Sequence, residues 1–361
     1  MVSSRKAKAV GLFSGSLDSI LATKLVIEQG INVVALHFRV PFAVPGRFAS
    51  ESQLQSLADL FGVSLVSVEV GTDYLDIVRA PQFGYICRMA PCVDCRAYML
   101  KKAKELMEEI KADFVFTGEV LGQRSFSQNK RSLKLLEKAA ELDGRLLRPL
   151  SAKILEPTIP ELTGLLRRER FFDFHGKKRR RQIRLAREFG LVDYPIPGGG
   201  CLLTDGNFAA RCQDAIEHNE LSLPEVELLR YGRHFRLASG GKAVVGRNEK
   251  ENEVLERLGV ARDLSVCKAV DVVGPVVLYR ARKKTKKDIE TVARICARYS
   301  DAPDGQTVKV RCGDQELYVK AVSDEKLKNW LIVWDCDRSI IKDVLVNKES
   351  IINESGDKRS N

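Results

Sequence analysis

No apolar run in this 361-residue sequence approaches the roughly 20 residues that a helix needs to cross a bilayer. The opening residues, MVSSRKAKAVGLFSG, also lack the pattern of a secretory signal and lead directly into an expected strand and glycine turn. Both absences argue against membrane-spanning and secreted proteins. We therefore expect a cytoplasmic protein with no membrane partner.

The cysteines lack the pattern of a disulfide framework, because the chain has nine of them and a cytoplasmic compartment is reducing. Cys267 in LSVCKAV and Cys296 in VARICARY are expected to be ordinary buried cysteines. There is no second C-x-x-C motif and no paired histidine, so the four ligands of a zinc site are missing. No internal repeat is visible either.

Acidic residues are too few to balance the basic ones. The formal net charge is +11 and the sequence pI is about 9.2. Lys and Arg side chains that neutralise phosphates supply much of the affinity for nucleic acids, so this balance favours a polyanionic partner. A merely basic cytosolic protein is the alternative that charge alone leaves open.

The N-terminal third alternates short apolar runs with segments of helical periodicity, which predicts an α/β fold with a doubly wound parallel sheet. The polar segments SGSLDS, RVPF, GTDY and TGEVLGQR each follow an expected strand. In such sheets ligands bind where the strands end, so these segments are expected to face one crevice. The expected strands cover residues 7–13, 31–38, 63–70 and 113–118, and the expected helices cover 18–29, 50–62 and 95–112.

The length predicts two or three domains. Residues 1–165 form the expected α/β domain, and 166–221 a basic, mostly helical segment that ends in the Gly- and Cys-containing stretch DYPIPGGGCLLTD. Residues 222–345 form a separate α+β domain, and the polar tail 346–361 is expected to be disordered. Strands are expected in the α+β domain at 269–281, 307–313, 315–322 and 330–335.

The segment SGSLDS, residues 14–19, has the character of a phosphate loop between a strand and a helix, but it lacks the lysine of a Walker A loop. A turn of small residues lets backbone N–H groups face an anion at a helix N-terminus. Ser14, Ser16 and Ser19 can add hydroxyl donors. Asp18 could cap the helix or support Mg²⁺ beside phosphates.

This loop resembles that of the N-type ATP pyrophosphatase (PP-loop) superfamily, SGGxDS, with Ser16 in place of the second glycine. The resemblance implies ATP and Mg²⁺ as ligands and cleavage between the α and β phosphates. It also implies adenine contacts from Leu36, His37 and Phe38, although His37 could be a strand-end histidine without a role. The loop residues that the resemblance assigns to ATP are Ser14, Gly15, Ser16, Asp18 and Ser19.

Cys92 and Cys95 form a C-x-x-C motif at the start of a helix, and Cys201 follows three glycines. The helix macrodipole, together with Arg88 and Arg96, is expected to lower the thiol pKa values. A redox pair or half of a zinc site would also fit a C-x-x-C motif. Cys87 could be a fourth ligand but is better interpreted as an ordinary nearby cysteine.

PCVDC and DYPIPGGGCLLTD together resemble the cysteine segments of tRNA thiouridine synthetases, and the similarity covers roughly residues 7–210. It implies adenylation of a tRNA uridine carbonyl oxygen, then sulfur transfer from a 4Fe–4S cluster or a persulfide, with release of AMP and pyrophosphate. The implied catalytic residues are Cys92, Cys95, Cys201 and Asp18, the cluster ligands being the three cysteines.

The same resemblance assigns Gly118, Glu119 and Gln123 to the nucleotide site and matches Arg148 and Lys153 to the family's RPL segment. Glu119 and Gln123 could instead cap a helix, and Arg148 could be a surface ion-pair partner. The implied partners are tRNA and a sulfur donor, with a homodimer left open. The family's N-terminal RNA-binding extension and C-terminal rhodanese-like domain are not seen, so RNA contact and sulfur supply are expected to come from elsewhere.

Residues 167–187 contain the densest basic stretch, with five consecutive cations whose expected role is to contact the RNA backbone. A solvated helix face is the alternative. The segment 231–258 resembles the RNA-binding module of NFACT proteins, which implies a second RNA surface over roughly 230–340. The consecutive cations are Lys177, Lys178, Arg179, Arg180 and Arg181.

Two other functions stay open. The chain could be an amide-forming adenylating enzyme of the same superfamily, with structural cysteines. It could also be a non-catalytic RNA-binding protein with a degenerate loop. Ser16 hints at degeneracy, whereas the intact Asp18 and Ser19 argue against it.

Overall fold

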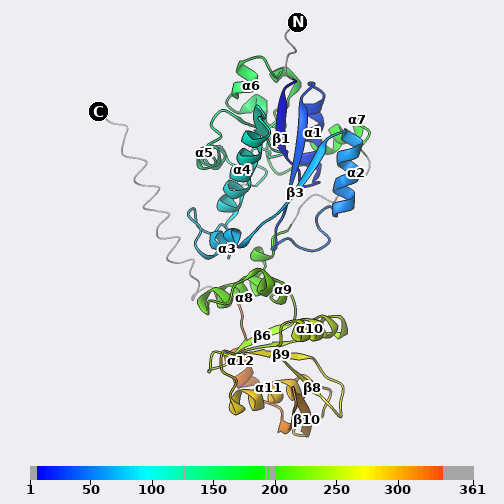
Figure 1. The fold of residues 1–361 in the computed structure, drawn as a ribbon, viewed down its shortest axis with the longest axis vertical. Coiled ribbons are helices and arrows are strands. Elements are labelled where there is room, and N and C mark those ends of the chain that lie inside the picture. The colour runs from blue at the N-terminus through cyan, green and yellow to red at the C-terminus, as the bar shows by residue number, and fades with distance from the viewer. Residues whose placement is uncertain (1–5, 125–126, 192–193, 195–199, 336–361) are drawn as a thin grey trace, which may run out of the picture. The chain divides into compact units, whose positions relative to one another are not determined.

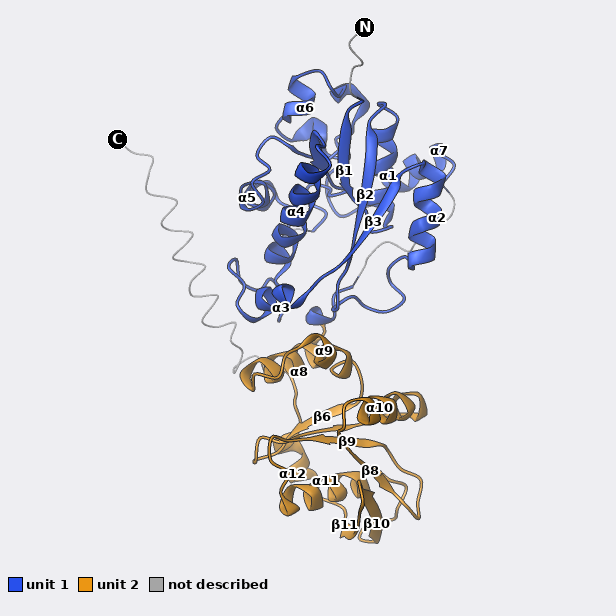
Figure 2. Ribbon diagram, viewed as in Figure 1, with its two compact units in different colours: residues 1–204, 340–361 blue, residues 205–339 orange. Residues whose placement is uncertain are grey.

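A computed structural model describes residues 6–124, 127–191, 194 and 200–335 (Figure 1). Residues 195–199 of the predicted glycine-rich stretch and the predicted tail 346–361 lie outside the described part. The chain folds into two units, and the second begins at Asp205 (Figure 2).

The first unit contains a parallel five-stranded sheet with the order β3-β2-β1-β4-β5, which confirms the predicted α/β class. The order runs outward from β1 in both directions, so the sheet has its switch point between β1 and β4. Crevices form at such points beyond the carboxyl ends of the strands. The strands are β1 (Lys8–Leu12), β2 (Asn32–Arg39), β3 (Ser64–Glu69), β4 (Phe114–Phe116) and β5 (Leu146–Leu147).

Helices cover both faces of this sheet. Successive residues of a strand point to opposite faces, so neighbouring positions pack against different helices. Ala9 packs in a core with Leu21 and Leu54, whereas the next residue, Val10, packs in a second core with Leu100 and Leu136. The first core holds α1 (Leu17–Ile27), α2 (Glu51–Phe61) and α7 (Arg180–Glu188), and the second holds α4 (Cys92–Glu109) and α5 (Lys130–Ala139). The first unit also contains the α-helices α3 (Thr72–Arg79) and α6 (Ile159–Leu162) and short 3₁₀ helices at Ala152–Ile154, Arg168–Arg170 and Leu202–Thr204.

Local capping explains where α2 begins and ends. The Ser50 side chain accepts a hydrogen bond from the Gln53 backbone, and the Gln53 side chain accepts one from the Ser50 backbone. Such a capping box satisfies two backbone donors of the first turn. The helix ends at Gly62, whose φ of 63° is the left-handed conformation that glycine adopts without strain.

The second unit is built on an antiparallel six-stranded sheet with the order β11-β10-β8-β9-β7-β6, which confirms a separate α+β fold. Its strands are β6 (Arg233–Arg236), β7 (Lys242–Val245), β8 (Ser265–Ala269), β9 (Val277–Arg280), β10 (Thr307–Cys312) and β11 (Gln315–Lys320). Its helices are α8 (Gly206–Glu217), α9 (Leu223–Leu228), α10 (Glu249–Ala261), α11 (Lys286–Arg298) and α12 (Asp324–Trp330).

The second unit begins earlier than the expected residue 222, because partly buried ion pairs and a buried arginine tie α8 to the rest of this unit. Arg236 of β6 pairs with Asp214 of α8 at 2.6 Å and with Glu220 at 2.7 Å. Arg211 of α8 donates to the Leu229 carbonyl oxygen at 2.9 Å.

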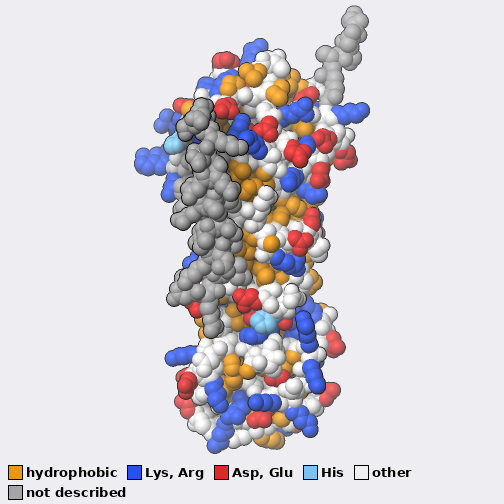
Figure 3. Space-filling view, turned by 90° about the vertical axis from the view of Figure 1, so that its left-hand side faces the viewer, with side chains coloured by type: hydrophobic (Ala, Val, Ile, Leu, Met, Phe, Trp, Pro, Cys, Tyr) orange, Lys and Arg blue, Asp and Glu red, His pale blue; other side chains and the backbone are white. Residues whose placement is uncertain are grey.

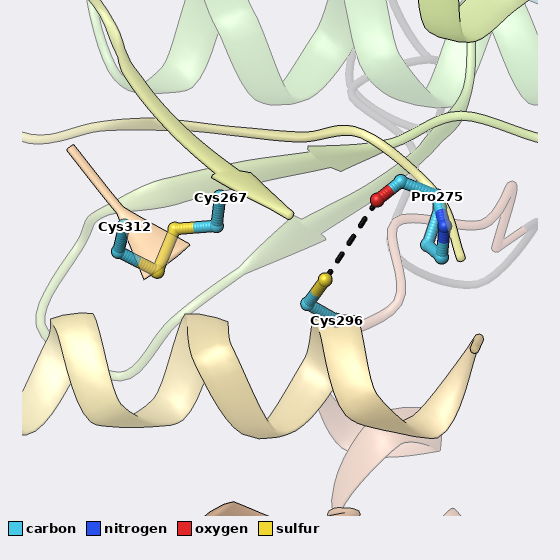
Figure 4. The surroundings of a disulfide bond; sticks show 4 residues. All are labelled: Cys267, Pro275, Cys296 and Cys312. Atoms are coloured by element: carbon cyan, nitrogen blue, oxygen red, sulfur yellow. Dashed lines mark hydrogen bonds between the residues drawn. A yellow bond between two sulfur atoms is a disulfide. The ribbon is translucent and has the colours of Figure 1, made fainter. Parts of the chain in front are cut away.

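Two expectations for the second unit are wrong. The apolar stretch 330–335 is not a strand: α12 ends at Trp330, and only Leu331 forms an isolated bridge, with Phe235. Cys267 is also not an ordinary free cysteine, because it forms a disulfide with Cys312 (Figure 4). The register of β8 and β10 places these two cysteines directly opposite each other, which brings their Cα atoms to 4.0 Å.

The other cysteine that was expected to be an ordinary buried one follows the prediction. Cys296 on α11 is fully buried in the core of the second unit, and its thiol lies 3.7 Å from the Pro275 carbonyl oxygen (Figure 4). No helix within the described residues is long and apolar enough to cross a membrane.

Candidate functional site

A cavity of about 540 Å³ lies in the first unit at the carboxyl ends of β1, β2 and β4. Its walls include both the predicted nucleotide residues and all three predicted sulfur-bearing cysteines. The predicted residues that line it are Ser14, Ser16, Asp18, Ser19, Leu36, His37, Phe38, Cys92, Cys95, Gly118, Glu119, Gln123, Arg179 and Cys201.

The loop after β1 places three hydroxyl groups at the start of α1. Ser14 Oγ lies 2.9 Å from Ser16 Oγ and 3.4 Å from Ser19 Oγ. Gly15 has a φ of 71°, so this position needs glycine, whereas Ser16 has a φ of −72° that suits any residue. The departure from SGGxDS therefore costs the loop no backbone strain and is no sign of degeneracy.

Gly118 lets the loop after β4 approach the start of α1. A Cβ atom on Gly118 would lie 2.5 Å from the backbone carbon of Asp18 and 2.6 Å from the backbone nitrogen of Ser19. Any larger residue would push these two segments apart. Gly118 therefore shapes this wall of the cavity through its backbone.

Asp18 is 6% exposed and has only one of its carboxylate oxygens engaged. Oδ2 accepts a hydrogen bond from Gln123 Nε2 at 3.0 Å and lies 3.4 Å from Arg179 Nη2. Oδ1 is buried without a hydrogen-bond partner. Burial raises the pKa of this carboxyl, while Arg179 and Gln123 oppose the rise. An orphaned carboxylate oxygen beside a phosphate loop fits the needs of Mg²⁺, which prefers oxygen ligands.

The adenine-side residues lie at the end of β2. His37 Nδ1 is 3.0 Å from the Phe13 carbonyl oxygen, so the ring also bridges the ends of β2 and β1. Burial lowers the pKa of His37, which keeps its imidazole neutral. Leu36 is buried and Phe38 half-buried, and both line the cavity.

Glu119 links Arg96 of the cavity wall to the buried Arg148. It lies 3.2 Å from Arg96 and 3.1 Å from Arg148, and these guanidinium groups lower its pKa despite burial. Arg148 is 3% exposed and also binds Glu137 at 2.5 Å, so it is a buried anchor rather than a surface ion-pair partner. Lys153 is exposed and does not line the cavity.

Cys201 reaches the cavity through a short strand-like pairing with the loop after β2. It forms an antiparallel bridge with Ala43, Leu202 N donates to Phe42 O at 2.8 Å, and Val44 N donates to Gly200 O at 3.1 Å. On its other side, Arg88 Nη1 donates to the Thr204 carbonyl oxygen just before α4. The segment is therefore held between β2 and the start of α4, where the C-x-x-C motif lies.

Cys92 is the first residue of α4, and Cys95 lies one turn later. The Tyr74 hydroxyl donates a hydrogen bond to Cys95 Sγ at 2.9 Å. The Tyr74 ring is 3% exposed and packs edge-on against Tyr98 at 5.4 Å between ring centres. Tyr74 therefore fixes the position of the Cys95 sulfur.

The expected lowering of the thiol pKa values is wrong. Burial raises the pKa of Cys92 and Cys95, and it raises that of Cys201 to about 12. Arg96 lowers the pKa of Cys92 but does not offset burial. Neighbouring sulfurs also raise these pKa values: Cys87 raises that of Cys92, Cys92 raises that of Cys95, and both Cys95 and Cys92 raise that of Cys201. These groups are therefore neutral thiols around neutral pH.

The three sulfurs are donors of the kind that hold an iron–sulfur cluster. Among the described residues, however, no group of three His, Cys, Asp or Glu side chains stands close enough together to hold a metal ion. The donor type fits a cluster, whereas the spacing does not present a ready-made ligand set.

The basic run divides into two parts. Arg179 lines the cavity, whereas Lys177, Lys178, Arg180 and Arg181 are exposed outside it. Arg181 pairs with Asp173 at 2.5 Å and stacks on the Phe174 ring at 4.5 Å. The face of the molecule that Figure 3 shows carries Lys and Arg side chains interspersed with acidic ones.

Sequence reasoning gave no role to several residues of the cavity wall, among them Tyr74 and Arg124. Both lie in segments that were expected to face the crevice, GTDY and TGEVLGQR. Their location just after an expected strand was therefore the sequence signal that points to the cavity. It could not show that the Tyr74 hydroxyl would contact the Cys95 sulfur.

Comparisons with known proteins match the resemblances drawn from the motifs. Residues 4–154 match the family described as thiamine biosynthesis protein (ThiI), and residues 232–331 match the NFACT protein RNA binding domain. A probable tRNA sulfurtransferase of Finegoldia magna is 30% identical over 144 residues, which are 39% of this chain and 35% of the relative. One of Lachnoclostridium phytofermentans is 30% identical over 131 residues, 35% of this chain and 32% of the relative.

The chain thus spans about a third of the length of these curated relatives. Among solved structures, a 4-thiouridine synthetase–RNA complex with bound ATP is 25% identical. It has a TM-score of 0.32 over 40% of this chain and 37% of that chain.

Proposed function

We propose that the protein is an enzyme, an ATP-dependent tRNA uridine sulfurtransferase. The observation that carries the proposal is the shared cavity: the serine loop with Asp18 and the three cysteines Cys92, Cys95 and Cys201 line the same walls. The names of the relatives and the match to the ThiI family support the same reaction, and the match to an RNA binding domain supports an RNA partner.

The first step activates the uridine. The start of α1 and the hydroxyls of Ser14, Ser16 and Ser19 face the phosphates of ATP, and Asp18 Oδ1 would hold Mg²⁺. A uridine carbonyl oxygen attacks the α phosphorus, and the bond to the β phosphate breaks. Pyrophosphate leaves, and the base carries AMP on its former carbonyl oxygen.

The second step replaces oxygen by sulfur. A hydrosulfide ion from the sulfur donor forms a C–S bond, and the C–O bond to AMP breaks, so no redox change is needed. A donor that arrives as a persulfide also requires cleavage of its S–S bond by a second cavity thiol, and an external thiol must then reduce the disulfide formed. A 4Fe–4S cluster, if held by Cys92, Cys95 and Cys201, would supply one open iron position for the sulfide.

The tRNA substrate would be bound by the exposed cations of the basic run, Lys177, Lys178, Arg180 and Arg181, and by the second unit. A uridine stacked within tRNA must be turned out to reach the cavity, at a cost of a few kcal/mol. These sites work in the cytoplasm, where tRNA and ATP are abundant.

Mass spectrometry of tRNA nucleosides tests the function directly. We expect a deletion strain to lose one thiolated uridine, and the wild-type gene but not an Asp18→Ala variant to restore it. An unchanged nucleoside profile would reject the function. Anaerobic purification with iron and sulfide analysis distinguishes a cluster from persulfide chemistry, and AMP formation without tRNA thiolation would favour the amide-forming alternative.

A further inference from the structure

We infer that Arg179 is a ligand of the ATP phosphates, separated in function from the RNA-contacting cations beside it in sequence. The inference rests on the proposed function for its nucleotide, but it assigns a residue that the motif similarity did not place at ATP. It also answers a question raised by the sequence: the serine loop has no Walker lysine.

Arg179 stands at the phosphate end of the cavity. Its Nη2 atom lies 3.4 Å from Asp18 Oδ2, and its side chain is 21% exposed. It immediately precedes α7, whereas Lys178 and Arg180 on either side are exposed and outside the cavity. One residue of a uniform basic run is thus turned inward while its neighbours face water.

The inward position is built into the fold. Leu185 and Ala186 of α7 pack in the same core as Leu21 and Leu25 of α1, so the start of α7 is fixed beside the serine loop. The chain before α7 is fixed as well, because Gly176 N donates to the Leu121 carbonyl oxygen at 2.8 Å. Gln182 is 1% exposed and its side chain bonds to Asp18.

The charges at this end suit a phosphate. Four other arginines line the cavity, Arg39, Arg47, Arg96 and Arg124. Arg96 is engaged by Glu119 at 3.2 Å, and Arg39 lies 3.5 Å from Glu51. Arg179 instead faces Asp18 Oδ2, while the other oxygen of that carboxylate, Oδ1, has no partner and is the one expected to hold Mg²⁺. The guanidinium has further N–H donors beside this oxygen pair, and its planar fork suits phosphate oxygens.

The closing experiment separates ATP from RNA. Binding of ATP–Mg²⁺, AMP and tRNA to the full chain is measured by calorimetry and filter binding for Arg179→Ala, Arg179→Gln and the matched control Arg180→Ala. Arg179→Gln keeps a donor for Asp18, which guards against loss of folding, and thermal melts check each variant.

We expect Arg179→Ala and Arg179→Gln to weaken ATP binding at least about tenfold. AMP, which lacks the β and γ phosphates, and tRNA should change less than about twofold. Arg180→Ala should show the reverse pattern, with weaker tRNA binding and unchanged ATP binding. Unchanged ATP binding in both Arg179 variants would overturn the inference and leave the proposed function standing. Failure of the wild-type chain to bind ATP would overturn both.

Discussion

In the first unit three cysteines keep free thiols around one cavity, whereas in the second unit two cysteines face each other across neighbouring strands and are bonded. Cys201 and Cys296 sharpen the contrast, because burial raises the pKa of each to about 12. Yet Cys201 lines a cavity and Cys296 is fully buried in a core. The role of a cysteine in this chain thus follows from access and neighbours rather than from acidity.

The largest expected effect is on the reaction itself. Replacing Cys201 by Ser removes one of the three sulfurs, so thiolation of tRNA should fall by about a thousandfold or more, as when a reacting group is removed. ATP binding should remain, because Cys201 does not belong to the serine loop. Nucleoside mass spectrometry and ATP calorimetry measure the two effects.

Cys87→Ser is the matched control for this prediction, because Cys87 is exposed and does not line the cavity. We expect it to keep wild-type thiolation. Activity retained in Cys201→Ser, or lost in Cys87→Ser, would show that the cavity thiols are not the sulfur-handling groups proposed above.

The next effect concerns pH. A pKa of about 12 means that the Cys201 thiolate fraction is small at neutral pH and grows as pH rises toward that value. Its alkylation by iodoacetamide should therefore accelerate about tenfold per pH unit, or about a thousandfold from pH 7 to pH 10. Peptide mass spectrometry follows each cysteine separately.

Cys296 should stay unmodified over the same range while the protein is folded, because no reagent reaches it. A Cys201 rate that levels off below pH 10 would contradict the burial effect. Equal modification of Cys201 and Cys296 would contradict the difference in access.

Much of the fold and of the candidate site could be predicted from the sequence, but not all of it. The alternation of apolar runs and helical periodicity is local, so it predicted the parallel sheet and placed the serine loop at its carboxyl edge. The C-x-x-C motif likewise lies at the start of α4, as expected. The expectations that proved wrong concern features that depend on contacts between distant segments or on burial.

The disulfide and Arg179 illustrate that limit. An argument from the reducing compartment says nothing about the register of β8 and β10, which places Cys267 opposite Cys312. Five consecutive cations look alike in sequence, and only the packing of α7 against α1 distinguishes Arg179. The lowered thiol pKa values were inferred from neighbouring charges, and the desolvation that reverses them is visible only in the folded chain.

A moderate effect is expected from the disulfide. The double variant Cys267→Ala/Cys312→Ala opens a link between residues 45 apart in sequence, which should lower the stability of the second unit by about 2–4 kcal/mol. Trp330 and Trp334 are the chain's two tryptophans and both lie in this unit, so their fluorescence during denaturation reports it selectively.

Cys296→Ala provides the control, since it removes a buried sulfur and leaves the disulfide intact, and it should cost about 1 kcal/mol. Thiolation should survive in both variants. If the double variant unfolds at the same denaturant concentration as the wild type, and a thiol titration of the unfolded wild type finds all nine cysteines free, the bond does not exist in solution.

The smallest expected effect tests how the first unit holds its sulfur. Tyr74→Phe removes the hydroxyl that donates to Cys95 Sγ at 2.9 Å but keeps the buried ring. That hydrogen bond lowers the pKa of Cys95 against the effect of burial, so its loss raises the pKa and reduces the thiolate. Since a hydrogen bond to a charged group contributes about 1.5 kcal/mol or more, Cys95 should be alkylated about tenfold more slowly at a given pH.

Tyr98→Phe is the matched control for Tyr74→Phe. Its ring packs on Tyr74, but its hydroxyl donates to Asp73 at 3.0 Å and not to a cysteine. We expect its Cys95 alkylation rate to match that of the wild type. A rate in Tyr74→Phe that equals the Tyr98→Phe rate would mean that the hydroxyl does not act on the sulfur. The Cys95 sulfur would then be held by packing alone.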